Sequence, residues 1–468
     1  MVTRVGGIAS GLDTEAIISA LIEAQSRPVT SLTSIVEDDE YKLGQWTELD
    51  DSLSDLRSMT EQLSSYSTWS QIAATSSDTS KLNATISSSA SPETGTYSIS
   101  VSTLAKAQSG YSNEVTAGKT ADIMGSNTAS YTINGATINI AANSSLTDIK
   151  DAINGQTSNM TSGVKASILG NRLVLENTTT GTGHDMAISY AGGTLDILGE
   201  SAGGGIGLIN SSGALVNETA SQNLTGTIGG TPFSSSTNTS SDLIEGVTLN
   251  FTATGDSTLT VGRDTSTIKS LISDFIEQYN ETMALLKEKG DVNLSSSGGI
   301  SSLGTLQGDY LLGMIQTNSR SILTSIDKNP NYMNQAYNSL YKVGIWFSSD
   351  ANELSIVDET KLDDALASNF DDVETLFRGW GNTTSGEGQG VLRRLDNFLY
   401  SQTDPINGGI TLRKNELDTD INSKNNEISA LNLRLLDYES DLWQHFAAME
   451  EAVSAIQDQG SYILSLLN

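Results

Sequence analysis

One stretch near the end of the chain decides the fold: residues 417–449 read LDTDINSKNNEISALNLRLLDYESDLWQHFAAM. Its apolar side chains recur at alternating steps of three and four residues, which is the heptad pattern of a helix that packs along one seam. Continued toward the end of the chain, the seam spans about seven repeats. Its predicted members are Leu417, Ile421, Lys424, Ile428, Leu431, Leu435, Tyr438, Leu442, His445, Met449, Ala452, Ile456, Gln459, Ile463 and Leu466.

This seam predicts a long helical rod. A continuous helix from Thr411 to Leu467 would be roughly 85 Å long at about 1.5 Å per residue, a length that no compact domain needs. The polar members Lys424, His445 and Gln459 weaken the seam but can fix its register, so the partner helix is specified. Two partners are compatible with the pattern, the N-terminal helices of the same chain and helices of other subunits, and both can operate together.

The N-terminal region is also helical. From Asp13 to Tyr66 the apolar residues keep helical spacing, and Asp13 has the residue type and position of an N-cap. The region is predicted to form one short helix and one long helix, and Pro28, which offers no amide donor, is expected to break or kink the path. The like-charged run at residues 37–40, EDDE, is expected to be a solvated face.

The middle of the chain follows the period of two that β-strands show. Residues 131–140 form two short strands around the turn Asn134-Gly135, and residues 164–175 form a second hairpin around Gly170-Asn171. Between the hairpins, Ser145 is expected to cap a short helix. Residues 67–264 are therefore mostly β, in two modules.

Further elements complete the prediction. Strands are expected at residues 97–101 and in a pair at 247–251 and 259–261 around Gly255. Amphipathic helices follow, and the C-terminal half also contains a small hairpin. These elements are a helix from Ile268, a helix at 310–326, a hairpin at 345–356 and a helix capped by Asp371. The order helix, sheet, helix lets the two chain ends pack together while the β modules loop out.

Composition excludes several classes of function. The 25 Lys and Arg against 56 Asp and Glu leave a net charge of −31, which repels phosphate backbones and argues against nucleic acid as a partner. With no Cys and only two His, thiolate chemistry is excluded and the stock of metal ligands and general bases is poor. No apolar run approaches the roughly 20 residues of a membrane span, and the N-terminus does not fit a cleaved signal peptide. The sequence therefore predicts no cofactor, no metal and no membrane insertion.

Two short motifs resemble known functional sites. Residues 199–203, GESAG, fit the G-x-S-x-G of a serine nucleophile elbow, but the glycines that follow are poor helix formers and the only downstream histidine is His445 in the seam. Asp418-x-Asp420-x-Asn422 resembles the start of a calcium loop but lacks the required Gly and Glu. We expect a glycine-rich loop and a polar helix face, and no catalytic residue.

Several stretches together resemble the flagellar filament cap family, also called hook-associated protein 2. The N-terminal IASGLDTE at residues 8–15 is similar to the family's opening, and residues 97–108 are similar to its first head-domain strand. Residues 131–175 resemble a repeat shared by flagellins and hook-associated proteins. Fragments at 242–249, 275–280, 306–309, 343–345, 434–435 and 444–450 are similar to the family's C-terminal half, whereas nothing is recognised at 192–239.

The resemblance implies an α+β multidomain fold with a helical coiled-coil leg from both termini and two β-rich head domains inserted between them. The expected parts are an N-terminal segment at 1–41, a leg domain at 42–69 and 266–410, a head domain at 70–112 and 240–265, an outer domain at 113–239 and a C-terminal coiled-coil helix at 411–468.

It also implies a secreted structural protein at the tip of the bacterial flagellum. Such a protein forms a ring of about five copies, retains exported flagellin, and promotes its folding and polymerisation. Flagellin, hook–filament junction proteins and an export chaperone would be its partners. The expected contact residues on the leg helices are Leu12, Ile17, Leu21, Leu417, Ile421, Ile428, Leu431, Leu435, Leu442, Phe446 and Met449.

Two other classes stay open on the sequence. Another exported axial or hook-junction protein would also pair its terminal helices around a β middle. A surface adhesin would bind its target through residues 113–239 alone. Enzyme function comes last, because the nucleophile-elbow motif lacks its expected partners.

Overall fold

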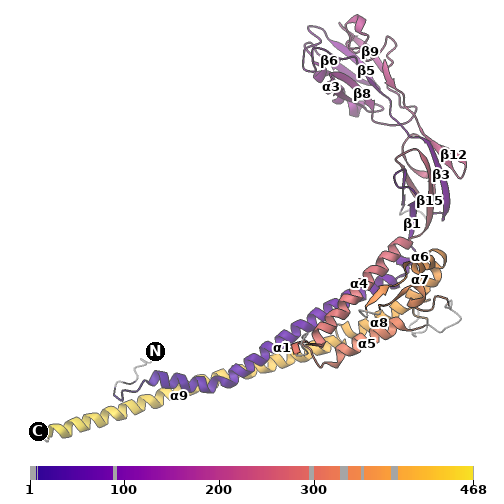
Figure 1. Cartoon of the computed structure of the whole chain (residues 1–468). Helices are drawn as coiled ribbons and strands as arrows, with labels where there is room; N and C mark the ends of the chain where they lie inside the picture. The colour runs from indigo at the N-terminus through magenta and orange to yellow at the C-terminus, as the bar shows by residue number, and fades with distance from the viewer. Residues whose placement is uncertain are drawn as a thin grey trace. The chain divides into compact units, whose positions relative to one another are not determined.

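The computed structural model describes residues 7, 9–87, 92–294, 300–326, 336–348, 353–380 and 388–466 (Figure 1). Of these, residues 292–294, 300–303, 465 and 466 are described by their backbone alone. The chain divides into two compact units. The helical unit takes both chain ends, Met1–Ser70 and Thr265–Asn468, and the β unit is Gln71–Asp264. The predicted order of helix, sheet and helix is confirmed.

The helical unit is built on two long helices, α1 (Thr14–Ser64) and α9 (Gly409–Leu466), which pack against each other. The predicted rod is confirmed: α9 has 58 residues, which corresponds to about 87 Å. In its second half α1 also packs against α4 and α8. The other elements of this unit are α2 (Tyr66–Trp69), α4 (Thr265–Gly290), β16 (Val292–Leu294), β17 (Ile300–Leu303), α5 (Tyr310–Thr324), η3 (Leu340–Val343), β18 (Ile345–Phe347), β19 (Leu354–Ile356), α6 (Glu359–Ser368), α7 (Phe370–Arg378) and α8 (Val391–Thr403).

One hydrophobic core holds these helices together. α1 contributes the fully buried Leu49, Leu53 and Leu56, and Trp69 packs edge-on against Phe370 at a centroid distance of 5.4 Å. Helices α4 to α8 close the core from the other side with buried aliphatic and aromatic side chains. The core therefore lies along the second half of α1.

Two local predictions in this unit are wrong. α1 runs through Pro28 without interruption, so there is one helix where two were expected. Pro28 removes one amide donor from a helix of 51 residues, and packing against α9 keeps the remaining turns together. The N-cap of α7 is Asn369, not Asp371, which lies in the first turn; the Asn369 carbonyl accepts the amides of Asp372 and Val373.

The β unit contains two hydrophobic clusters, in agreement with the expected two modules. The first cluster lies between a five-stranded sheet, β1-β15-β3-β11-β12, and a three-stranded sheet, β13-β14-β2. All neighbouring strands are antiparallel. The strands are β1 (Ile72–Ser76), β2 (Leu82–Ile86), β3 (Gly95–Thr103), β11 (Leu224–Ile228), β12 (Thr231–Ser235), β13 (Thr239–Ile244), β14 (Val247–Phe251) and β15 (Gly255–Arg263).

The expected hairpin between residues 247–251 and 259–261 does not form. β14 pairs with β13 and β2, whereas β15 pairs with β1 and β3, so the chain crosses from one sheet to the other at this point. Gly255 makes the crossing possible because its φ of +122° is one that other residues rarely adopt.

The second cluster lies among a three-stranded sheet, β6-β5-β9, a four-stranded sheet, β10-β4-β8-β7, and helix α3. Both predicted hairpins are confirmed, and their turn residues Asn134, Gly135, Gly170 and Asn171 all have positive φ. Ser145 caps α3 with a reciprocal capping box to Asp148. The elements are β4 (Ser109–Tyr111), β5 (Ala129–Ile133), β6 (Ala136–Ile140), α3 (Leu146–Asn154), η1 (Thr157–Asn159), β7 (Val164–Leu169), β8 (Arg172–Asn177), β9 (Ile188–Gly193), η2 (Ser201–Gly203) and β10 (Asn217–Thr219).

Candidate assembly surface on the paired terminal helices

α1 and α9 pack against each other along an apolar contact, which we call the α1–α9 seam. The other features of the site are described relative to this seam. The two helices are antiparallel, because Asp50 of α1 pairs with Lys414 at the start of α9, whereas Ser10, just before α1, meets Glu450 far along α9. On α1 the side chains turned toward α9 include the buried Ile18 and Val36. Figure 1 shows the two helices side by side.

The C-terminal seam follows the predicted heptads for its first half only. Ile421 is buried, and Leu417, Ile428, Leu431, Leu435 and Leu442 are half-buried. After Leu442 the step is four residues, not three, so Phe446 and Val453 take the places predicted for His445 and Ala452, which are exposed. Two consecutive steps of four locally unwind a heptad pattern.

Lys424 is the polar member of the seam that fixes register. Its ammonium lies 3.1 Å from a carboxylate oxygen of Asp39, a residue that is only 7% exposed, and it also pairs with Asp420. The hydrogen bonds to Asp420 and then Asp39 raise the pKa of Lys424, so the seam keeps its charge. The expectation that the whole 37–40 run is solvated is therefore wrong at Asp39. Gln459, the third polar member predicted, is exposed.

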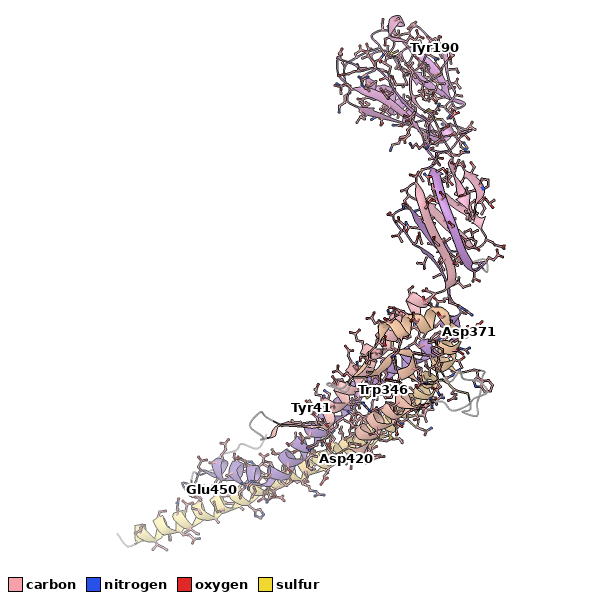
Figure 2. The ribbon with its side chains drawn as sticks, turned by 45° about the vertical axis from the view of Figure 1, so that its right-hand side comes forward. Tyr41, Tyr190, Trp346, Asp371, Asp420 and Glu450 are labelled. Atoms are coloured by element: carbon pink, nitrogen blue, oxygen red, sulfur yellow. The ribbon has the colours of Figure 1, made fainter. Side chains whose placement is uncertain are left out.

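The N-terminal segment before α1 is held by the carboxylate of Glu450. This carboxylate accepts the backbone amides of Ala9 at 2.9 Å and Ser10 at 3.2 Å, and also the Ser10 hydroxyl. Gln457 adds a hydrogen bond from its amide to the Ala9 carbonyl at 2.7 Å. Figure 2 shows Glu450 on the distal part of α9. These contacts place the resemblance-bearing segment at 9–15 against α9; Ile8 lies outside the described residues.

The protection of the N-terminal segment by the Glu450 carboxylate should depend on pH. The Ser10 hydroxyl and then the Ala9 amide lower the pKa of Glu450, so the folded state prefers the carboxylate. A lowered pKa stabilises this contact above the ordinary glutamate range, near pH 4.3, and this contribution is lost as the pH falls through the lowered value. We therefore expect amide exchange at Ala9 and Ser10, followed by NMR, to lose protection in acid.

Glu450→Gln provides the control for this pH dependence. The neutral amide is expected to leave Ala9 and Ser10 weakly protected at every pH, while amides at the Asp39–Lys424 level keep their protection. Equal protection of Ala9 in the variant and the wild type would contradict the role of the carboxylate.

The outer faces of both helices carry apolar side chains in solvent. The predicted contact residues Leu12, Ile17 and Leu21 are 46%, 37% and 38% exposed, so they do not lie in the α1–α9 seam; the neighbouring Ile18 does. On α9 the exposed set is Leu412, Leu433, Leu436, Ile456, Tyr462, Ile463 and Leu464. The seam members keep the two helices together, whereas the exposed set lies outside the seam.

The two motifs that resemble a nucleophile elbow and a calcium loop do not form such sites in the structure. Ser201 of the GESAG motif begins the short helix η2, and no strand leads directly into it, since β9 ends at Gly193. Its hydroxyl accepts a hydrogen bond from the amide of Asn113 at 2.8 Å. Asp418 and Asp420 lie on an exposed face of α9. Within the described parts of the chain, no group of three or more His, Asp or Glu is placed to hold a metal ion.

No helix among the described residues is long and apolar enough to cross a membrane. Paired terminal helices, with β modules inserted between them in the sequence, define the class of this molecule as a multidomain α+β protein organised around its two chain ends.

Comparison with known proteins gives the family. Residues 221–458 match the family model described as flagellar hook-associated protein 2 C-terminus, and residues 10–108 match the model of its N-terminus. The flagellar hook-associated protein 2 of Escherichia coli K12 is 30% identical over 479 residues, covering 98% of this chain and 96% of the relative. The A-type protein of Pseudomonas aeruginosa is 26% identical over 492 residues, covering 100% and 97%. The chain therefore belongs to the flagellar hook-associated protein 2 family.

A solved structure of a flagellar cap protein is also similar to this chain. The crystal structure of the D1-D2-D3 domains of the flagellar cap protein from Escherichia coli is 27% identical to this chain, with a TM-score of 0.45. The match covers 80% of this chain and 99% of that structure.

Proposed function

We propose that this chain caps the distal end of the bacterial flagellar filament as a closed ring of several copies. The ring retains flagellin that emerges from the export channel and promotes its folding and insertion. The observation that carries the proposal is the pairing of α1 with α9, which shields one apolar seam and leaves Leu12, Ile17 and Leu21 exposed on an outer face. Burial of such side chains stabilises association by roughly 25 cal/mol per Å² of apolar surface.

The ring performs its work by binding and enclosure, without a covalent step. Membership of a structural family supports this proposal. The same proposal includes export to the flagellar tip, an export chaperone before secretion, and contacts with hook–filament junction proteins. It also includes the finer division into the segments 1–41, 42–69 with 266–410, 70–112 with 240–265, 113–239 and 411–468.

The proposal is tested by complementation. A bacterium that lacks its own copy of this gene is supplied with the wild-type chain or with Leu12, Ile17 and Leu21 replaced by serine, and flagellin is measured in the medium and in filaments. We expect the wild type to move flagellin into filaments and the triple variant to lose it to the medium. Leu169→Ser, at a residue of β7 that is 74% exposed, is the matched control and is expected to behave as the wild type.

Native mass spectrometry of the purified chain supplies the second measurement. We expect a defined multiple of the chain mass. A chain that stays monomeric at micromolar concentration, or filament growth that continues in the triple variant, would overturn the proposal.

A further inference from the structure

Helices α4 and α5 and the hairpin of β18 and β19 surround a pocket within the helical unit. Its volume is about 340 Å³, at the lower end of the range for small-molecule sites. The lining includes Tyr279, Met283, Arg320, Phe347 and Glu353, and α1 and α9 contribute none of its described lining residues. We call it the α4–α5 pocket.

Contacts within the chain hold the walls of this pocket in place. Asn280 of α4 donates its side-chain amide to the Leu354 carbonyl at 2.8 Å and accepts the Leu354 amide at 2.9 Å, so the start of β19 is fixed against α4. Gln316 of α5 donates to the Met283 carbonyl at 3.4 Å and joins α5 to α4. Glu353, directly before β19, is thereby held beside the pocket.

Arg320 supplies an unpaired cation to the pocket. Its guanidinium carbon lies 3.9 Å from the centroid of the Phe347 ring, and this cation–π contact positions the side chain. The described residues give the guanidinium no ion pair and no hydrogen bond. Its N–H donors, which match a carboxylate in a two-pronged geometry, are therefore available.

Tyr279 supplies a buried hydroxyl to the same pocket. The residue is 3% exposed, and its hydroxyl forms no hydrogen bond with any described residue. Buried polar groups are nearly always hydrogen-bonded, so this hydroxyl indicates a missing partner. Burial raises the pKa of Tyr279, and the nearby charge of Arg320 opposes that shift only in part. The hydroxyl stays protonated and, with Arg320, offers donors to an anionic oxygen.

The other charges of the pocket restrict the ligand. Lys287 and Asp291 form an ion pair with each other. Glu353 is exposed, and neither it nor Arg320 has an ion pair with any described residue. A ligand with negative charge alone would be repelled by Glu353, and one with positive charge alone would be repelled by Arg320. The pocket is therefore suited to a small ligand that carries both charges.

We propose that the α4–α5 pocket binds a free α-amino acid with an apolar side chain. The ligand carboxylate accepts hydrogen bonds from the Arg320 guanidinium and the Tyr279 hydroxyl, and the ligand ammonium pairs with Glu353. The ligand side chain packs against Met283 and Phe347. The inference goes beyond the proposed capping function and does not depend on the ring, because all the contacts lie within one copy of the chain.

Three related compounds test the class of ligand. L-leucine, titrated into the full wild-type chain and followed by ligand-observed NMR, is expected to bind with a Kd of about 1 mM, since few atoms make contact. N-acetyl-L-leucine lacks the ammonium and L-leucinamide lacks the carboxylate, so each is expected to bind at least about tenfold more weakly. Absence of saturable L-leucine binding, or equal binding of the three compounds, would overturn the inference.

Two charge-removing variants test the residues. Arg320→Gln is expected to weaken L-leucine binding by about tenfold and to remove the preference for L-leucine over L-leucinamide. Glu353→Gln is expected to remove the preference over N-acetyl-L-leucine and to keep the preference over L-leucinamide. Tyr279→Phe, which loses only the hydroxyl, is expected to weaken L-leucine binding by about threefold. Arg434→Gln and Glu427→Gln, at exposed positions of α9, are the matched controls and are expected to bind as the wild type does.

The pattern of preferences separates ligand contact from a structural role. Circular dichroism and tryptophan fluorescence verify that each variant is folded. Damage to the pocket would weaken all three compounds by the same factor, whereas a lost contact changes the ranking of one analogue against L-leucine. An unchanged ranking in both Arg320→Gln and Glu353→Gln would overturn the inference.

Discussion

Replacing Leu53 by alanine is expected to lower the free energy of unfolding of the helical unit by about 2–5 kcal/mol. Leu53 is 0% exposed, between Leu49 and Leu56 on the face of α1 that enters the main core. Removal of its side chain loses the transfer free energy of the buried methyl groups and leaves a cavity that rigid helices on several sides cannot fill. The loss approaches a large part of the stability of an ordinary domain.

Tryptophan fluorescence isolates this effect. All five tryptophans, at positions 46, 69, 346, 380 and 443, belong to the helical unit, so urea unfolding followed by fluorescence reports on that unit alone. Leu412→Ala, at a position of α9 that is 56% exposed, is the control and should change stability by less than about 0.5 kcal/mol. Equal losses in both variants would show that the Leu53 side chain is not in a packed core.

Periodicity predicted most of the fold because one physical cause dominates each element. The long apolar seam of α9 and the alternating strands around Asn134-Gly135 can bury their side chains in only one way. Ser145 likewise has the hydroxyl and the following Asp148 that a helix start needs. These predictions depend only on residues that are close together in the sequence.

Most of the wrong predictions depend on partners far along the chain. Pro28 breaks helices in isolation, but here α9 supports the turns on both sides of it. Asp39 belongs to an acidic run and would be solvated, except that Lys424, 385 residues away, stands opposite. The β14–β15 hairpin fails because both strands find better partners elsewhere in the β unit.

Only part of the candidate surface can be predicted from the sequence, for the same reason. The regular spacing of Leu431, Leu435 and Leu442 puts them on the seam. The change of phase after Leu442, which leaves Phe446 half-buried and His445 exposed, is not marked by that spacing. On α1, Ile17 and Ile18 are equivalent in the sequence. Only the position of α9 decides that Ile18 is buried and Ile17 is exposed.

The distal end of α9 should carry the largest functional effect. Ile456, Ile463 and Leu464 are 68%, 57% and 65% exposed, beyond the reach of the buried part of α1. Figure 1 shows α9 continuing past the start of α1. Three apolar side chains without cover on one rod are suited to bind a partner surface, and under the proposed function that partner is the filament end with its newly added flagellin.

Replacing Ile456, Ile463 and Leu464 by serine is therefore expected to weaken binding of the chain to filament ends by about a hundredfold, since roughly 1 kcal/mol of apolar burial is lost at each position. The fluorescence-detected stability of the helical unit should stay at the wild-type value, because none of the three side chains is buried in it. Binding is measured by co-sedimentation with purified filaments, and flagellin lost to the medium by the complementation assay. Ile406→Ser, at a residue 73% exposed outside the helices, is the control. Wild-type binding by the triple variant would show that the end of α9 does not contact the filament, and a fall in stability would show that these side chains are packed within the chain.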